Sequence, residues 1–263
     1  MKIDNMPQIV YNYRKNNITI QGYSESDWIF SLIKKTKTFY EIDLLKYINF
    51  TLSQRQGCIL DIGANIGNHS VYFGVIMQKK VICFEPNPPV FKILKENLKI
   101  NKVNFEIYDI GLGSVNDTYS IDDSHFATKN NIGAAKLSKC DGGAIKVKTL
   151  DSIYNNFDLG NNESIIGIKA DIEGMESEML KGAVETLKVY KPDLFLEIND
   201  KYNMDKIENI LYPLGYQKLY SYAETPVWHF SHTSQLSLIK KLRLYTYYHV
   251  SRLKHLIRNS IKS

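Results

Sequence analysis

The sequence has little cysteine and no long apolar run. Three of its 263 residues are cysteine, Cys58, Cys83 and Cys140, and their wide spacing excludes a disulfide framework and a cysteine zinc site. The longest apolar stretch, residues 71–77, has seven residues, whereas a membrane-spanning helix needs about 20. The first twenty residues also lack the continuous apolar segment of a secretory signal peptide. These absences predict a protein of the reducing cytoplasm without a transmembrane helix.

Acidic residues are absent from the end of the chain. None follows Glu224, whereas seven lysine and arginine residues do, and removing these seven charges from the net +5 leaves −2 for the rest. Apolar residues recur there at helical spacing, which predicts a basic amphipathic helix over residues 233–263. We expect this helix to pack on its own domain or on a second copy. Peripheral contact with an anionic membrane and stacking of its tyrosines on nucleic-acid bases are the alternatives.

Apolar strand-like segments alternate with amphipathic helices through the middle of the chain. Such alternation predicts a doubly wound, mostly parallel α/β sheet covered by helices on both faces. We place this domain at residues 57–232, after an N-terminal appendage over residues 1–56 whose helix packs on the core. A polar segment at 112–143 interrupts the pattern. The predicted strands are 58–63, 80–86, 103–111, 165–174 and 193–199, and the predicted helices include 66–77, 88–101 and 175–190.

A glycine-containing segment, DIGANIGNH over residues 61–69, begins at the end of the first predicted strand of this domain. Gly63 and Gly67 allow the backbone to approach a ligand closely. Asn65 and Asn68 stand where a dinucleotide motif needs its second and third glycines, which disfavours an NAD oxidoreductase. S-adenosylmethionine (SAM) has no phosphate and tolerates a side chain at Asn65. Asp61 ends the strand at the same edge of the sheet.

Carboxylates also mark the ends of the next strands, where ligands of α/β sheets bind. Glu85 lies 24 residues after Asp61 and is suited to accept hydrogen bonds from both ribose hydroxyls of a cofactor. Asp109 or the backbone of Ile110 is placed to meet the adenine edge. His69 follows the glycine segment at a helix start, a position that favours a neutral imidazole. Tyr40, beside Glu41, is a candidate to close over the methionine end of the cofactor.

Five segments in this order and spacing resemble the FkbM-type family of SAM-dependent methyltransferases: DIGANIGNHSVYFG, FEPNPPVFKILKENLKIN, VKTLDSI, IGIKADIEGMESEMLKGA and KPDLFLEI. The resemblance spans about residues 39–199. It implies a class I SAM-methyltransferase (Rossmann-like) fold, with a seven-stranded doubly wound sheet whose last strand is antiparallel. It also implies O-methylation, often of sugar hydroxyls.

The candidate catalytic residues follow the fourth and fifth strands. Transfer to a sugar hydroxyl requires a general base or a metal ion. Asp171, Glu173 and Glu197 offer oxygen ligands suited to Mg²⁺; alternatively Asp171 orients the SAM amine, and a carboxylate or histidine is the base. Lys169 neutralises these acids or binds a substrate phosphate. Among the histidines, His229 is a candidate from the last strands, and His125 lies in the polar interruption.

We therefore expect a SAM-dependent O-methyltransferase acting on a carbohydrate, as a nucleotide-activated sugar or a capsule or lipopolysaccharide precursor. The expected partner is a small-molecule sugar rather than nucleic acid, and a homo-oligomer is compatible with the basic C-terminal segment. An RNA methyltransferase is the alternative that this segment supports. A non-catalytic SAM-binding scaffold is the other, and it is disfavoured because the carboxylates at the strand ends are present.

Overall fold

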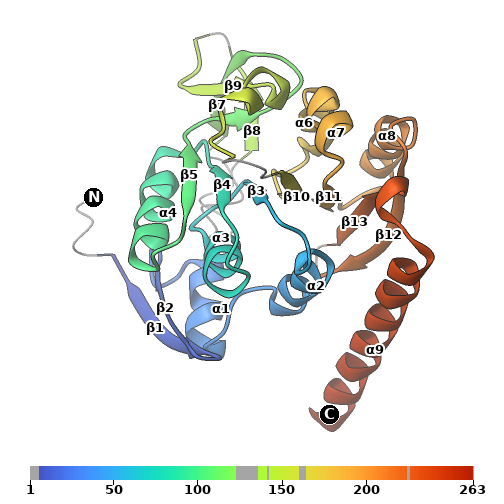
Figure 1. The fold of residues 1–263 in the computed structure, drawn as a ribbon. Helices are drawn as coiled ribbons and strands as arrows, with labels where there is room; N and C mark the ends of the chain where they lie inside the picture. Colours follow the sequence, from blue (N-terminus) through green and yellow to red (C-terminus); the bar gives the residue numbers. More distant parts are fainter. Residues whose placement is uncertain (1–5, 123–135, 141, 160–163, 224–225, 263) are drawn as a thin grey trace.

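The computed structural model describes residues 6–122, 136–140, 142–159, 164–223 and 226–262 (Figure 1). Its centre is a seven-stranded sheet in the order β12-β13-β11-β10-β3-β4-β5. The strands are β3 (Cys58–Ile62), β4 (Val81–Phe84), β5 (Phe105–Tyr108), β10 (Ile165–Ala170), β11 (Asp193–Glu197), β12 (Tyr216–Tyr222) and β13 (Val227–His232).

The pairing of these strands confirms the predicted topology. Strands β5, β4, β3, β10 and β11 are parallel to one another, whereas β13 runs antiparallel to both β11 and β12. The chain proceeds outward from β3 to β5 and then returns to β10 on the other side of β3. This reversal between β3 and β10 is the point at which ligands of such sheets bind.

Helices cover both faces of the sheet, so the prediction of a doubly wound fold is also confirmed. Side chains of β3 alternate between two apolar cores, with Ile59 in one and Leu60 in the other. The first core contains α1 (Trp28–Thr36), α2 (Ile42–Leu52), α3 (Asn68–Val71) and α4 (Pro88–Ile100). The second contains α6 (Glu176–Lys181), α7 (Val184–Tyr190) and α8 (Lys201–Leu211). Because both faces of these strands are buried, successive side chains are apolar and the strands read as continuous apolar runs.

The N-terminal appendage is not only helical, because it begins with a β-hairpin of β1 (Gln8–Tyr13) and β2 (Asn16–Gln21). The hairpin buries every second residue, namely Ile9, Tyr11, Ile18 and Ile20. The residue between the buried pair is apolar in β1 (Val10) and polar in β2 (Thr19), so the sequence shows no regular alternation across the hairpin. Two asparagines of α4 bind the backbone of β2. Asn97 accepts from Gln21 N–H at 2.7 Å and Asn101 from Thr19 N–H at 3.0 Å, and each amide donates back to the same residue's carbonyl.

Two predicted helices differ in detail. The helix expected over 66–77 is α3 followed by a π-helical turn at Tyr72–Ile76. The helix expected over 175–190 is divided into α6 and α7 at Gly182. A Cβ atom on Gly182 would lie 2.0 Å from the carbonyl oxygen of Gly113, so the chain needs glycine where these segments touch. The polar interruption contributes a small sheet in the order β6-β9-β7-β8, formed by β6 (Gly111–Leu112), β7 (Asp117–Asp122), β8 (Lys136–Lys139) and β9 (Ile145–Lys148).

The chain ends in a long helix, α9 (Leu238–Lys262), which extends away from the sheet (Figure 1). Its first half packs on the domain: Leu244 is buried, and Tyr247 stacks on Phe50 of α2 with ring centroids 4.3 Å apart. Packing of this segment on its own domain is thus observed. No helix among the described residues is both long and apolar enough to span a bilayer.

Candidate active site at the carboxyl ends of the central strands

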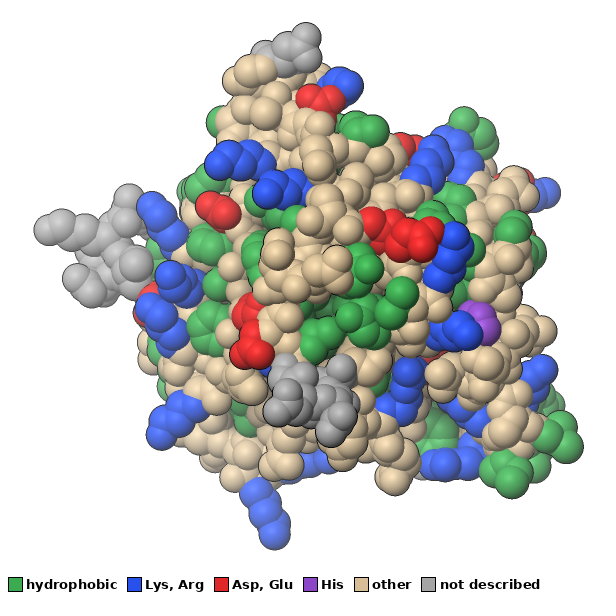
Figure 2. Space-filling view, turned by 45° about the horizontal axis from the view of Figure 1, so that its top comes forward, with side chains coloured by type: hydrophobic (Ala, Val, Ile, Leu, Met, Phe, Trp, Pro, Cys, Tyr) green, Lys and Arg blue, Asp and Glu red, His purple; other side chains and the backbone are tan. Residues whose placement is uncertain are grey.

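A cleft opens where β3, β4 and β10 end. Figure 2 shows acidic side chains beside a hydrophobic patch near the middle of the face seen there, with lysine and arginine around them. Glu85, Asp171 and Glu173 are the charged residues that line the cleft, and none of the lining residues within the described chain is basic. The other lining residues are Ile62, Gly63, Phe84, Pro86, Ile110, Gly111, Leu112, Ile172 and Met175.

Gly63 brings the backbone of two strands together at the floor of the cleft. Its φ is +73°, and a Cβ atom there would lie 2.0 Å from the carbonyl oxygen of Asp171. The backbone N–H of Asp171 donates to the carbonyl of Ile62 at 3.1 Å. Gly67 also has a positive φ, of +90°. Glycine is therefore required by close approach at Gly63 and favoured by backbone conformation at both positions.

Glu85 is buried at the end of β4, and backbone donors hold its carboxylate. Oε2 accepts from Asn65 N–H and Oε1 from Asn87 N–H, both at 2.9 Å. Burial raises the pKa of Glu85 to about 7, although these two backbone hydrogen bonds lower it. Each carboxylate oxygen keeps a further lone pair, so the group can accept from a ligand hydroxyl pair. Asn65 thus contributes its backbone, at a φ of +50°, to holding Glu85.

Lys169 lies buried on β10 among carboxylates. Its Nζ atom is 3.6 Å from Asp61 Oδ1, 3.5 Å from Asp171 Oδ2 and 3.4 Å from the Gly63 carbonyl oxygen. Burial alone lowers the pKa of this ammonium, but Asp171, Asp61, Glu41 and Glu197 together raise it, so Lys169 is charged. We call Lys169 and these four carboxylates the lysine cluster. The positive charge of Lys169 neutralises these acidic side chains. This is the first of the two roles that the sequence analysis gave to Lys169.

Asp61 and Asp171 have different surroundings within the lysine cluster. The side chain of Asp61 is enclosed, accepts from Ser70 Oγ at 2.5 Å and does not line the cleft, so it supports the glycine segment from below. Burial raises the pKa of Asp61. Asp171 reaches the cleft. Burial acts to raise its pKa, but Lys169 and a side-chain hydrogen bond with Glu197 hold the pKa below the usual range.

Tyr40, Asn68 and His69 lie together beside the cluster. Asn68 accepts from the Tyr40 N–H at 3.1 Å and donates to the Tyr40 carbonyl at 3.2 Å, so its side chain fixes the loop before α2. His69 Nε2 is 3.4 Å from Glu41 Oε2. Burial, followed by the charge of Lys169, lowers the pKa of His69 to about 3. A lowered pKa keeps the imidazole neutral. The sequence analysis expected a neutral ring because His69 stands at a helix start, whereas the causes in the structure are burial and the charge of Lys169.

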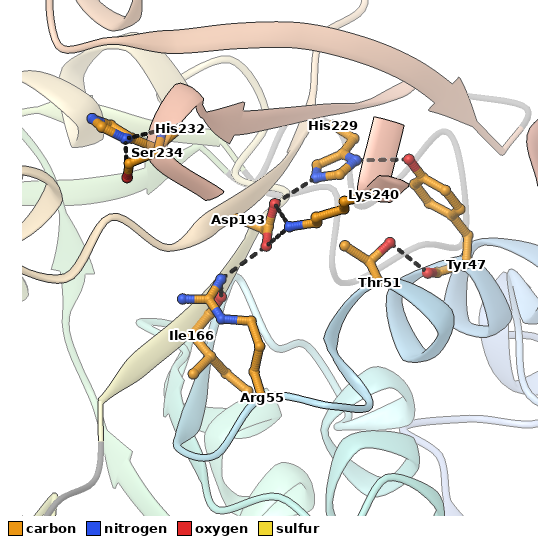
Figure 3. A network of polar contacts seen from close by, with 9 residues as sticks. All are labelled: Tyr47, Thr51, Arg55, Ile166, Asp193, His229, His232, Ser234 and Lys240. Atoms are coloured by element: carbon orange, nitrogen blue, oxygen red, sulfur yellow. Dashed lines mark hydrogen bonds and ion pairs between the residues drawn. The ribbon is translucent and has the colours of Figure 1, made fainter. Parts of the chain in front are cut away.

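Two predicted residues lie away from this group. Asp109 is exposed and does not line the cleft, whereas its neighbour Ile110 does. His229, the catalytic candidate from the last strands, does not reach the cleft. His229 is buried on β13, with Nε2 3.0 Å from Asp193 Oδ1 and Nδ1 2.7 Å from the hydroxyl of Tyr47 (Figure 3). Asp193 begins β11, so this network lies toward the opposite edge of the sheet. His125 lies outside the described residues.

The loop after β10 contains a residue that sequence analysis missed. Glu176 is buried and its Oε1 accepts from Ile172 N–H at 3.0 Å and Gly174 N–H at 3.4 Å. Burial raises its pKa to about 6. These bonds hold the turn in which Glu173 adopts a φ of +54° and faces the cleft. No clear signal in the sequence indicated this role, because local capping of backbone turns is typical of Ser, Thr, Asn and Asp rather than Glu.

The predicted magnesium site is not supported. Within the described part of the chain, no three histidine, cysteine or acidic side chains are arranged to hold a metal ion. The reason is visible at Asp171, where the ammonium of Lys169 supplies the positive charge that these carboxylates need. The donor set therefore fits a neutralised acid cluster better than a cation site.

Sheet order, the single reversed strand and an acidic cleft at the β3–β10 reversal define a class I, Rossmann-like methyltransferase domain. The family model described as "Methyltransferase FkbM domain" matches residues 61–218, and the chain belongs to this family of SAM-dependent methyltransferases.

Relatives of known name share part of the sequence. "Hexuronic acid methyltransferase AglP" of Haloferax volcanii is 28% identical over 138 residues, covering 52% of this chain and 54% of the relative. "Methyltransferase sdnD" of Sordaria araneosa is 29% identical over 157 residues, covering 48% and 60%. The matches thus span little more than half of each relative. A solved FkbM methyltransferase from Methylobacillus flagellatus KT has a TM-score of 0.47 at 19% identity, over 67% of this chain and 44% of that one.

The cleft fits SAM by charge. SAM bears a net positive charge and no phosphate, whereas the pyrophosphate of a dinucleotide would face Glu85, Asp171 and Glu173 without a basic residue in the lining. The buried carboxylate of Glu85 also matches the ribose diol common to both cofactors. The acidic lining is thus the observation that favours SAM over a dinucleotide as the cofactor.

Proposed function

We propose that this protein is a SAM-dependent O-methyltransferase that acts on a hydroxyl group of a carbohydrate. The observation that carries the proposal is the acidic cleft, in which three carboxylates line the site and the lysine cluster lies beneath it. Carboxylates bind a cationic methyl donor and accept hydrogen bonds from sugar hydroxyls. The hexuronic acid methyltransferase among the relatives supports a sugar acceptor.

The three carboxylates have separate roles in this proposal. SAM supplies the methyl group from its positively charged sulfur. Glu85 accepts the ribose hydroxyls. Asp171, whose pKa is held low by Lys169, stays ionised and binds the cationic part of the cofactor. Lys169 and Glu197 are positioning residues that act through Asp171.

Glu173 is the proposed general base. A base must take the proton of the acceptor hydroxyl during attack, and the low pKa of Asp171 makes that carboxylate a poor acceptor. Glu85 belongs to the β4 end of the cleft and already accepts two backbone hydrogen bonds. Glu173 is the third acidic residue of the lining and lies on the same loop as Asp171.

We further propose that the acceptor is a nucleotide-activated sugar or a precursor of a surface polysaccharide, and that the reaction takes place in the cytoplasm. Free cysteines at Cys58, Cys83 and Cys140 support a reducing compartment. The test is incubation with methyl-labelled SAM and separate pools of nucleotide sugars, lipid-linked saccharides and RNA, analysed by mass spectrometry. Label on a sugar oxygen is expected. Label on RNA alone, or no binding of SAM in calorimetry, would contradict the proposal.

A further inference from the structure

Helix α9 presents one face to the domain and another to solvent. On the inner face, Lys240 Nζ lies 3.2 Å from the buried Asp193, Leu244 is buried, and Tyr247 stacks on Phe50. One turn further, the Ser251 Oγ atom is 3.3 Å from the hydroxyl of Tyr222 on β12. These positions recur at three- and four-residue spacing, so one side of the helix is fixed against α2 and β12 from Lys240 to Ser251.

The opposite side of α9 is apolar and exposed. Its apolar side chains are between 45% and 83% exposed, which is unusual for so many large apolar residues on one helix. Leu238, Ile239, Leu242 and Tyr245 follow one another at three- and four-residue spacing. Beyond the exposed polar residues Thr246 and His249, Val250 and Leu253 continue on the same side, so the set forms a stripe, interrupted once, that faces away from the domain. We call this set the outer stripe; it consists of Leu238, Ile239, Leu242, Tyr245, Val250 and Leu253.

Basic residues border the outer stripe. Lys241, Arg243 and Arg252 are exposed, and on a helical projection they lie on its two sides. The chain has no acidic residue after Glu224 that would balance them. An exposed apolar stripe with only cationic borders therefore matches a partner that is apolar within and anionic at its surface.

We propose that the outer stripe docks this enzyme on an anionic lipid bilayer, with its apolar side chains among the acyl chains and its basic residues at the phosphate groups. A helix that lies in the membrane interface has this arrangement. A second copy of the chain is disfavoured as the partner because it would bring an equally cationic helix against the first. Nucleic acid is disfavoured because leucine and isoleucine offer no contact to phosphates. The inference goes beyond the methyl-transfer reaction and does not depend on it.

The test measures sedimentation of the full-length protein with vesicles of phosphatidylcholine, with and without phosphatidylglycerol. We expect binding to the anionic vesicles only, and weaker binding as salt is raised. Each leucine that enters the bilayer is worth about tenfold in partitioning, so Leu238→Gln with Leu242→Gln is expected to weaken binding by about a hundredfold. Lys241→Gln with Arg252→Gln is expected to weaken binding to the anionic vesicles and to reduce its dependence on salt.

The matched control is Val189→Gln on α7, which replaces an equally exposed apolar residue outside the outer stripe and should leave vesicle binding unchanged. SAM affinity and melting temperature serve as folding controls for every variant. Vesicle binding that is unchanged in the leucine double variant overturns the proposal. A wild-type dimer that the same variant dissociates, without vesicle binding, would assign the stripe to a second copy. Binding of an RNA oligonucleotide in place of vesicles would also overturn it. Vesicle binding requires no turnover, so failure here is distinguishable from failure of the proposed activity.

Discussion

Glu173 combines backbone strain with a position in the cleft. A non-glycine residue in the left-handed region costs about 1–2 kcal/mol, and such strain is concentrated at functional sites. If Glu173 is the general base, Glu173→Gln should lower kcat by roughly 10²–10⁴-fold. SAM affinity measured by calorimetry should stay at the wild-type value. A variant with full activity would assign the proton transfer to another group.

The pKa of Glu85, raised by burial to about 7, makes a prediction about pH. The ionised carboxylate accepts hydrogen bonds from ribose better than the protonated form, so SAM affinity should rise as pH increases through about 7. The folded state keeps a proton that the unfolded chain releases near 4.5, so Glu85 stabilises the fold below that pH. This contribution is lost as pH rises from about 4.5 to about 7.

Glu85→Gln should remove the pH dependence of SAM affinity and the contribution of this side chain to the pH dependence of stability. The variant should bind SAM more weakly at high pH and show a flatter curve of affinity against pH in calorimetry. Its melting temperature should also change less between pH 4.5 and 7 than that of the wild type. An unchanged affinity curve would show that Glu85 does not contact the cofactor.

At the scale of elements, the approach of β3 to β10 depends on Gly63. Gly63→Ala adds a methyl group 2.0 Å from a backbone carbonyl oxygen, so the strand ends must separate. We expect loss of SAM binding and a large fall in melting temperature. Gly174→Ala is the matched control, because it has a similar positive φ of +98° but nothing within 4 Å of the added atom. That control should lose only about 1–2 kcal/mol of stability.

The sequence predicted the elements whose signal is local. Buried strands such as β3 and β10 read as apolar runs, and Gly63, Glu85 and Asp171 were placed at one edge because parallel strands end there. Interactions between distant segments were not predictable in this way. The Asp151 carboxylate, for example, accepts from Glu185 N–H at 3.0 Å and Thr186 N–H at 2.8 Å, at the start of α7 and 34 and 35 residues further along the chain.

The difference between local signals and contacts of distant segments also explains how much of the candidate site could be predicted. Residue types and strand ends indicated an acidic edge, but the sequence did not indicate which carboxylates face the cleft. Asp61 lies near the end of β3 and Asp171 directly follows β10, yet only Asp171 of the two reaches the cleft because Asp61 lies beneath the glycine segment. His229 was misplaced because its partners, Tyr47 and Asp193, are 182 and 36 residues away in sequence.

At the scale of the whole molecule, Asp193 joins three parts of the chain. Its carboxylate contacts Arg55 after α2 at 2.9 Å, His229 on β13 at 3.0 Å and Lys240 on α9 at 3.2 Å (Figure 3). Burial acts to raise the pKa of Asp193, but the hydrogen bond from His229 and the charge of Lys240 outweigh it and lower the pKa. The stabilisation is present above the ordinary pKa of 3.8 and is lost as pH falls below it.

His229→Gln tests whether this network is structural. Removing a buried partner leaves polar groups unsatisfied, which costs about 1–3 kcal/mol. We expect a lower melting temperature with kcat and SAM affinity within a factor of about two of wild type, since the cleft does not include this side chain. A selective loss of kcat at unchanged stability would restore His229 as a catalytic residue.

The paired asparagines of α4 have a consequence for how the molecule behaves at high concentration. A strand at the border of a small sheet exposes backbone donors and acceptors that can recruit a strand from another chain. Asn97 and Asn101 bind the N–H and C=O groups of Gln21 and Thr19, so their amides take the place of a third strand beside β2. The outer edge of β2 is thereby closed to a strand from another chain at Thr19 and Gln21, by two side chains one helical turn apart.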